Sequence, residues 1–221
     1  MPRSRDELLN IPDPAWPDLA NHIVAARNSV RVLPRTETGA YETLQFLQVT
    51  VRSTLGAIAW ETGGLLIDNG WIRLLGSGHA ALPGTLYTWN NTTSPLHVSG
   101  ALIVAYDVIG GVFALNGGAF AGTVGDVSYF APDLLRWEEM QRGYTDFFQW
   151  LLSGDLEAFY KDARWPRWQG ETNMLAGDRG ISIYPPMWIS GSPIAERSRR
   201  AVPVTELWLS ERDFAAQLDR A

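Results

Sequence analysis

Glycine pairs bracket short apolar runs between residues 101 and 130, and this pattern restricts the fold more than any other part of the chain. The stretch reads ALIVAYDV, IGG, VFALN and GG in succession. Glycine adopts the positive φ that a tight turn between antiparallel strands requires. We therefore predict three consecutive antiparallel strands at 101–108, 112–116 and 124–130, with turns at 109–111 and 117–123.

The same stretch is apolar enough to be considered as a membrane span, but its composition argues against one. It contains Asp107 and Asn116, together with six glycines between residues 101 and 125. A spanning helix needs about 20 predominantly apolar residues, and both glycine and β-branched residues weaken a helix. We therefore expect no membrane partner.

Helices are predicted before this sheet. Spacings of three and four between apolar residues predict one helix over about 40–60; the residues are Leu44, Leu47, Val51, Leu55 and Ile58. An earlier helix is predicted over about 15–27, and Pro17 is compatible with it because proline is tolerated in the first turn of a helix. Asp68-Asn69-Gly70 is typical of a turn, and a strand is predicted at 71–75.

The segment after the sheet is the richest in aromatic residues, with eleven between residues 129 and 168. Thr145 is expected to cap a helix that ends at Gly154, and Asp155 to cap a second helix up to about residue 162. A strand is predicted at 202–209, followed by a last helix that Ser210 caps.

These elements predict an α+β fold, in which helices pack on an antiparallel sheet and a Trp-rich C-terminal helical segment extends it. We expect a single domain over residues 1–221. Its parts are a helical N-terminal layer (1–60), a sheet core (71–130) and aromatic-rich helices with a late strand (131–221).

Composition limits the classes of partner. The net charge of −6 argues against nucleic acid, which requires clustered Lys and Arg on one face. Cysteine is absent, which excludes disulfides and thiolate metal sites and favours a reducing cytoplasm. The N-terminal residues include charges and prolines where a secretory signal needs an apolar run. We therefore expect a cytoplasmic protein.

No pattern indicates a cofactor or a metal. Residues 76–81, GSGHAA, imitate a dinucleotide-binding loop, but Pro83-Gly84 would break the helix that must hold the pyrophosphate. The three histidines, His22, His79 and His97, lack the spacing of metal ligands. We therefore expect neither a cofactor nor a metal.

Four acidic residues in one segment suggest acid/base chemistry as an alternative; they are Asp126, Asp133, Glu138 and Glu139. Two neighbouring carboxylates are what glycoside hydrolysis requires. Asp133 follows Pro132, however, and also fits a residue that starts a helix, which is the interpretation we favour. No serine stands in a Gly-x-Ser-x-Gly elbow, and we assign no catalytic residue.

The tryptophans raise a different question. Trp137, Trp150, Trp165 and Trp168 suggest a stacking platform for a sugar or a peptide, although aromatic residues more often fill a core. Residues 164–168, RWPRW, alternate Arg and Trp around a proline that prevents a smooth helix interior. We therefore expect at least one of these rings beside solvent, stacked under a guanidinium group.

Several motifs of the sheet and of the aromatic-rich segment resemble an uncharacterised bacterial family, domain-of-unknown-function family 2625. The resemblance covers about residues 71–208. It is carried by GGVFALNGG (110–118), YFAPD (129–133) with Trp137-Glu138, FY (159–160), and Arg164-Trp165 with Trp168. This resemblance implies no catalytic residue.

A more distant similarity is to the Smi1/Knr4-type domains of the SUKH superfamily. In those, a strand like 112–115 is followed by a turn, a strand like 126–130, an acidic residue and a helix like 144–152. Members are α+β, and many bacterial ones look like immunity proteins that neutralise a toxin by binding it. The resemblance thus implies a SUKH-like fold and a protein partner, while the Trp-rich tail after Gly154 departs from the pattern.

Three classes of function follow. The first is a non-enzymatic binding module that resembles the immunity proteins; the others are a sugar- or small-molecule-binding protein with a Trp-lined pocket and a carboxylate-dependent hydrolase. The candidate binding residues are Asn116, Asp133, Trp137, Glu138, Arg164, Trp165 and Trp168.

Overall fold

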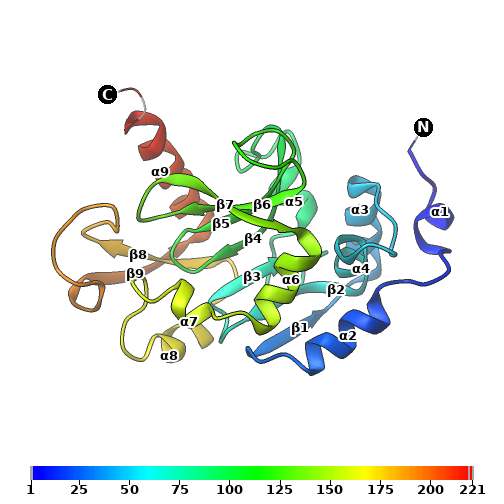
Figure 1. The fold of residues 1–221 in the computed structure, drawn as a ribbon, viewed down its shortest axis with the longest axis horizontal. Coiled ribbons are helices and arrows are strands. Elements are labelled where there is room, and N and C mark those ends of the chain that lie inside the picture. The colour runs from blue at the N-terminus through cyan, green and yellow to red at the C-terminus, as the bar shows by residue number, and fades with distance from the viewer. Residues whose placement is uncertain (1, 219, 221) are drawn as a thin grey trace.

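A seven-stranded antiparallel sheet runs through the centre of the molecule in a computed structural model, which describes residues 2–218 and 220 (Figure 1). The strands lie side by side in sequence order. They are β1 (Val30–Pro34), β2 (Thr62–Ile67), β3 (Ile72–Leu75), β4 (Ala101–Asp107), β5 (Val112–Asn116), β6 (Asp126–Ala131) and β7 (Arg136–Gly143). A separate two-stranded sheet pairs β8 (Arg179–Tyr184) with β9 (Ser198–Pro203).

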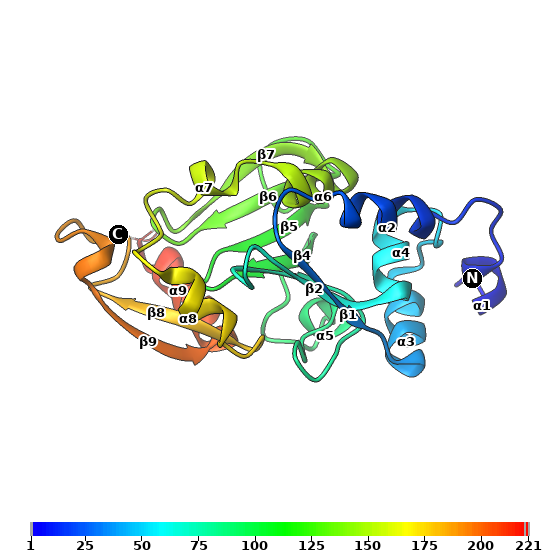
Figure 2. The same cartoon turned by 90° about the horizontal axis from the view of Figure 1, so that it is seen from below.

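Helices pack on this sheet, which confirms the predicted α+β class. They are α1 (Arg5–Leu9), α2 (Trp16–Val24), α3 (Glu37–Leu47), α4 (Thr54–Glu61), α5 (Leu86–Asn90), α6 (Tyr144–Ser153), α7 (Leu156–Phe159), α8 (Trp168–Asn173), α9 (Val204–Leu218) and the 3-10 turn Ile194–Glu196. The N-terminal helices gather at one end, and α8, α9 and the β8–β9 sheet lie at the other (Figure 2). Within the described residues, no helix combines the length and apolar character needed to cross a membrane.

The glycine-bracketed stretch forms three neighbouring strands, as predicted. β4, β5 and β6 begin and end within two residues of the predicted bounds, with turns at 109–111 and 117–123. Gly110 and Gly118 have φ values of 99° and 107°, a conformation that other residues adopt only with strain. The turn at 68–70 and the strand that follows it are confirmed as well.

Register places two rows of side chains on opposite faces of the sheet, because directly paired residues share a face. The first face carries the row Leu65, Leu74, Ala105, Phe113, Tyr129 and Glu138. The second face carries the row Arg31, Leu66, Arg73, Tyr106, Val112, Phe130 and Trp137.

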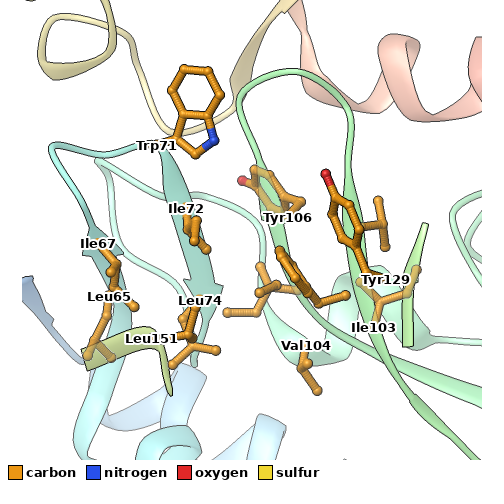
Figure 3. Close-up of a cluster of buried hydrophobic side chains, with 14 of the residues drawn as sticks. Leu65, Ile67, Trp71, Ile72, Leu74, Ile103, Val104, Tyr106, Tyr129 and Leu151 are labelled. Carbon is orange, nitrogen blue, oxygen red and sulfur yellow. The ribbon is translucent and has the colours of Figure 1, made fainter. Parts of the chain in front are cut away.

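Different helices cover the two faces. α6 packs on the first face, where the Phe147 ring lies 5.1 Å from the Phe113 ring and Leu151 lies beside the β2 and β3 leucines (Figure 3). α9 packs on the second face, where the Trp208 ring lies 5.0 Å from the Phe130 ring. The central strands β2 to β6 are therefore buried on both sides, whereas β1 and β7 are partly exposed. Polar residues within the central strands stand out.

The single helix predicted over 40–60 is wrong, because α3 and α4 occupy that segment as two helices. Gln48 adopts a left-handed conformation with φ 54° and ends α3, and Ser53 then caps α4. Leu44 and Val51 pack in a small cluster that is separate from the main core around Ile58. Apolar spacings of three and four thus continue across a break that periodicity does not detect.

Of three capping predictions for the segment after β6, two are wrong and one is confirmed. Residues 132–135 form the turn between β6 and β7, so Asp133 does not start a helix. Thr145 lies within α6, and Gly143 takes the capping position. Asp155 does cap α7, because its carboxylate accepts from the Ala158 N–H at 2.9 Å.

The strand predicted at 202–209 is wrong, as is the helix start at Ser210. β9 ends at Pro203 and α9 begins at the next residue, so Ser210 lies within that helix. The Val and Thr residues of this segment favour a strand locally. The helix prevails because it buries Val204 and Trp208, which are four residues apart and share one face.

Candidate functional site

A cleft of about 610 Å³ opens between the β6–β7 hairpin, the segment around the end of α7 and the loop that joins β8 to β9. Its carboxylates come from Asp133, Glu138 and Asp162. We call it the acidic cleft; its other lining residues are Ile109, Tyr129, Ala131, Pro132, Phe159, Tyr160, Ala163, Met187, Trp188, Ile189, Ser190, Gly191, Ser192, Pro193, Ile194 and Arg197.

The hairpin positions two of these side chains by simple sheet geometry. Tyr129 of β6 pairs directly with Glu138 of β7, so both side chains lie on the same face of the sheet. Asp133 lies in the four-residue turn between the strands, which Leu135 closes with a positive φ of 53°. Asp133 and Glu138, both predicted as site residues, are therefore brought to one cleft, whereas Asp126 and Glu139 do not line it.

A fully buried carboxylate lies behind the cleft floor. The Oδ2 atom of Asp107 accepts from the Tyr129 and Tyr160 hydroxyls, at 2.8 and 3.1 Å. Its Oδ1 atom accepts from the backbone N–H groups of Ile109 and Gly111, at 3.0 and 2.8 Å. Burial raises the pKa of Asp107 above its ordinary value, although these four bonds act in the opposite direction.

The two tyrosines remain protonated, because burial and the nearby Asp107 raise both pKa values well above the ordinary value. Each donates its hydroxyl hydrogen to Asp107. A phenolic oxygen has one hydrogen to donate and otherwise only accepts. Tyr129 and Tyr160 are only 7% and 2% exposed, so they offer no free hydroxyl donor to a ligand in the cleft.

The glycine pair of the β4–β5 turn is required by the two acids that approach it. A Cβ atom on Gly111 would collide with the Asp107 carboxylate and the Tyr129 hydroxyl. A Cβ atom on Gly110 would collide with the carboxylate of Glu211 from α9. Gly110 is thus required both by its positive φ and by close approach, whereas Gly111 is required by close approach alone.

Arg197, the cation of the cleft lining, is committed to the loop that carries it. Its guanidinium group donates to four carbonyl oxygens, those of Pro185 (3.1 Å), Pro186 (2.6 Å), Ile189 (2.9 Å) and Ser192 (2.9 Å). These bonds use most of its five N–H groups. Its charge remains, but the lining holds three carboxylates, those of Asp133, Glu138 and Asp162. Glu138 and Asp162 also form exposed ion pairs with Arg136 (3.2 Å) and Lys161 (3.9 Å), which solvent weakens.

The expected exposed ring in residues 164–168 is wrong, because Trp165 and Trp168 are only 2% and 8% exposed. Their rings lie 5.6 and 5.0 Å from the ring of Trp71. The predicted stacking with guanidinium groups is present, since Arg164 lies 4.0 Å from the Trp168 ring centroid. Arg164 also pairs with Asp68 of the β2–β3 turn.

This cluster fastens the segment that carries Tyr160 to the sheet, because the Trp71 and Tyr160 rings lie 5.4 Å apart. Trp71 lies immediately before β3, and Figure 3 shows its ring above the strand. The predicted residues Arg164, Trp165 and Trp168 thus support the cleft wall from behind and do not line it.

The other predicted residues have separate locations. Asn116 is buried and organises the loop after β5, because its Oδ1 atom accepts from the N–H groups of Gly118 and Phe120 at 2.8 and 3.2 Å. Trp137 stacks on Phe120 with the ring centroids 4.0 Å apart. Trp150 packs against Phe113 and Phe159. The four predicted tryptophans therefore do not form one platform.

Sequence reasoning missed the residues on which the site is built. Asp107 counted only as a charge that opposes a membrane span, and Tyr129 and Tyr160 counted only as aromatic residues. One signal was present, because an acidic residue at the end of an apolar strand and before a glycine pair must find donors once buried. Asp162 carried no such signal.

The fold and the cleft define an α+β protein with an antiparallel meander and an acidic cleft beside its β6–β7 hairpin. The chain belongs to the family described as Protein of unknown function DUF2625, which matches residues 5–207. It is 41% identical over 206 residues to the uncharacterized protein YbfG of Escherichia coli K12, covering 93% of this chain and 94% of that protein.

A second relative is an uncharacterized protein of Haemophilus influenzae. It is 38% identical over 196 residues, covering 86% of this chain and 85% of that protein. No solved structure gives a significant match.

Proposed function

We propose that this protein is a cytoplasmic, non-enzymatic binding module whose acidic cleft receives a basic segment of a protein partner. The observation that carries the proposal is the set of acceptors around the cleft. Asp133, Glu138 and Asp162 contribute carboxylates, and Tyr129 and Tyr160 have given their hydrogens to Asp107. A ligand that fits these groups is a donor of hydrogen bonds and carries positive charge.

Arginine is the side chain that suits this lining best. Its planar guanidinium group carries five donors in a fork that matches carboxylates, and it stacks on aromatic faces. Phe159 is exposed on one wall of the cleft, and Trp188 lies on the other. Ile189, also exposed, adds apolar surface of the kind that a protein partner covers.

Two further observations support a protein partner. The net charge of −6 steers a basic partner toward the molecule. The resemblance of residues 112–152 to SUKH domains, many of which look like immunity proteins, supports a role in binding and neutralising another protein.

A carboxylate-dependent hydrolase is the second candidate, and one observation favours it. Asp133 and Glu138, two of the four acidic residues predicted for such chemistry, line the same cleft. A sugar-binding pocket made of tryptophans has less support, because the predicted tryptophans lie in separate places.

Fluorescence anisotropy with a labelled hexaarginine peptide tests the proposal. The variant D133N/E138Q/D162N removes the three cleft carboxylates while keeping the shape of each side chain. We expect it to bind the peptide at least about tenfold more weakly than the wild type, which is about 1.4 kcal/mol of binding free energy. A hexaglutamate peptide should not bind to either protein.

The matched control is D18N/E42Q/D146N, which removes three exposed carboxylates outside the cleft. It changes the net charge equally, so it should keep wild-type affinity. Equal loss in both triple variants would reduce the effect to net charge and overturn the proposal. Turnover of nitrophenyl glycosides by the wild type but not by D133N would support the hydrolase instead.

A further inference from the structure

We infer that a second binding site, for the dianionic oxygens of a phosphate group, lies on the opposite face of the sheet between Arg73 and Arg31. This site is independent of the acidic cleft and has the opposite electrostatic sign. We call it the arginine pocket; its lining residues are Ser29, Val30, Arg31, Leu66, Asn69, Gly70, Arg73, Thr172, Asn173 and Leu175.

The first observation is a buried cation without a matching anion. Arg73 lies in β3, between β2 and β4, and is 1% exposed. Its Nε atom has no hydrogen-bond partner among the described residues, and its Nη1 atom donates a long hydrogen bond of 3.5 Å to the Trp71 carbonyl oxygen. A buried guanidinium group with unpaired N–H groups is costly for a fold.

Arg73 keeps its charge in spite of this environment. Burial lowers its pKa to about 10, while the negative charges of Asp107 and Asp178 and the nearby Tyr106 act to raise it. A pKa of about 10 leaves the guanidinium group protonated at neutral pH. Neither aspartate forms an ion pair with Arg73 within the described part of the chain, so an anion in the pocket would be the group that completes its bonding.

The second observation is a second arginine in register with the first. Leu66 of β2 pairs with Arg31 on one side and with Arg73 on the other, so the two arginines share a face. They are two strand spacings apart, which is about 10 Å between their backbones. Arg31 is exposed whereas Arg73 is buried, so one cation lies at the mouth and one at the floor.

The rest of the lining supplies further donors and little negative charge. The Ser29 hydroxyl oxygen accepts from the Asn69 backbone N–H at 2.8 Å, so its own hydrogen remains a donor. Asn173 adds an amide group from the segment that covers the pocket. No Asp or Glu is among the described residues that line it, although the chain carries a net charge of −6.

The size and charge of the pocket favour a phosphate group over a carboxylate. Two guanidinium groups, one buried and one at the pocket mouth, match the two negative charges of a phosphate, and each can bind two of its oxygens. The volume of about 190 Å³ holds that group together with a small organic part, which Val30, Leu66 and Leu175 would contact. Inorganic phosphate and a phosphate monoester are the two sources of this chemistry.

Calorimetric titration with inorganic phosphate, phenyl phosphate and acetate tests the inference on the full chain. We expect saturable phosphate binding that weakens at least about tenfold in R31Q. R73M should abolish binding, and its apolar side chain of similar length suits the buried position. R52Q is the matched control, since Arg52 is exposed and lies outside the pocket, and it should bind like the wild type.

The remaining outcomes also decide the question. Tighter binding of phenyl phosphate than of inorganic phosphate assigns the site to a monoester, and the reverse order assigns it to the free ion. Acetate binding as tight as phosphate, no saturable binding, or equal affinity in R31Q and R52Q would overturn the inference. If R73M fails to fold, the comparison between R31Q and R52Q still decides, because both positions are exposed.

Discussion

Replacement of Glu211 by Gln should stabilise the protein, and the gain should increase with pH. Glu211 lies on α9, is 3% exposed, and its Oε2 atom has no hydrogen-bond partner among the described residues. Burial raises its pKa well above the ordinary value, and the negative charge of Asp107 adds to that rise. The folded protein therefore keeps the Glu211 proton over a pH range in which the unfolded chain has lost it.

The magnitude follows from proton linkage. Below the ordinary glutamate pKa of 4.5 both states bind the proton, and the substitution should change little. Above it the unfolded state binds fewer protons than the folded state, so the wild type loses about 1.4 kcal/mol of stability per pH unit until the raised pKa is reached. Gln matches the protonated side chain in shape and does not titrate. The advantage of E211Q should therefore grow as pH rises above 4.5, until the raised pKa of Glu211 is passed.

Urea denaturation at several pH values, followed by tryptophan fluorescence, measures this difference. E206Q is the matched control, because Glu206 lies on the same helix but is exposed. The free energy of unfolding should change with pH in parallel for the wild type and E206Q, whereas that of E211Q should fall less as pH rises. Parallel curves for all three proteins would refute the claim that the buried Glu211 is protonated.

Two further substitutions test the packing around the site. Trp165→Ala should lower the free energy of unfolding by about 3–5 kcal/mol, because the ring is buried against Trp71. Tyr184→Ala, at a position that is 71% exposed, is the control. Similar losses of stability in the two variants would contradict the burial of Trp165. Gly111→Ala should lower it by about 1–3 kcal/mol through collision with the Asp107 carboxylate. The control is Gly170→Ala, whose added methyl group would meet open space within α8 and should be neutral or stabilising in the same denaturation experiments. Equal effects of the two substitutions would contradict the collision proposed at Gly111.

The central strands could be predicted from local sequence patterns, whereas elements that depend on long-range packing could not. β4, β5 and β6 follow from apolar runs that end at glycine pairs, because each turn depends only on its own residues. The break at Gln48 was not predictable, since a single left-handed residue leaves the apolar spacing intact. The segment after Pro203 has local strand propensity, and burial of Val204 and Trp208, with Trp208 packed on Phe130, favours the helix.

The site shows the same division. Asp133 and Glu138 could be proposed from residue type and closeness in sequence, and the hairpin does bring them to one cleft. Tyr160 reaches Asp107 across 53 residues, a contact that no local pattern contains. The burial of Arg73 likewise depends on a covering segment about 100 residues further along the chain, around Asn173. The buried polar groups that distinguish this protein are therefore the ones that required the structure.

The location of the bound basic segment is the most direct test of the proposed binding function. Backbone amide shifts should be recorded by two-dimensional ¹⁵N NMR while hexaarginine is added to the wild-type protein. We expect the largest changes within residues 129–138, 159–163 and 187–197, the segments that contribute the lining of the acidic cleft, and we expect these changes to disappear in D133N/E138Q/D162N. Changes concentrated in α1–α3, or changes that persist in that variant, would contradict it.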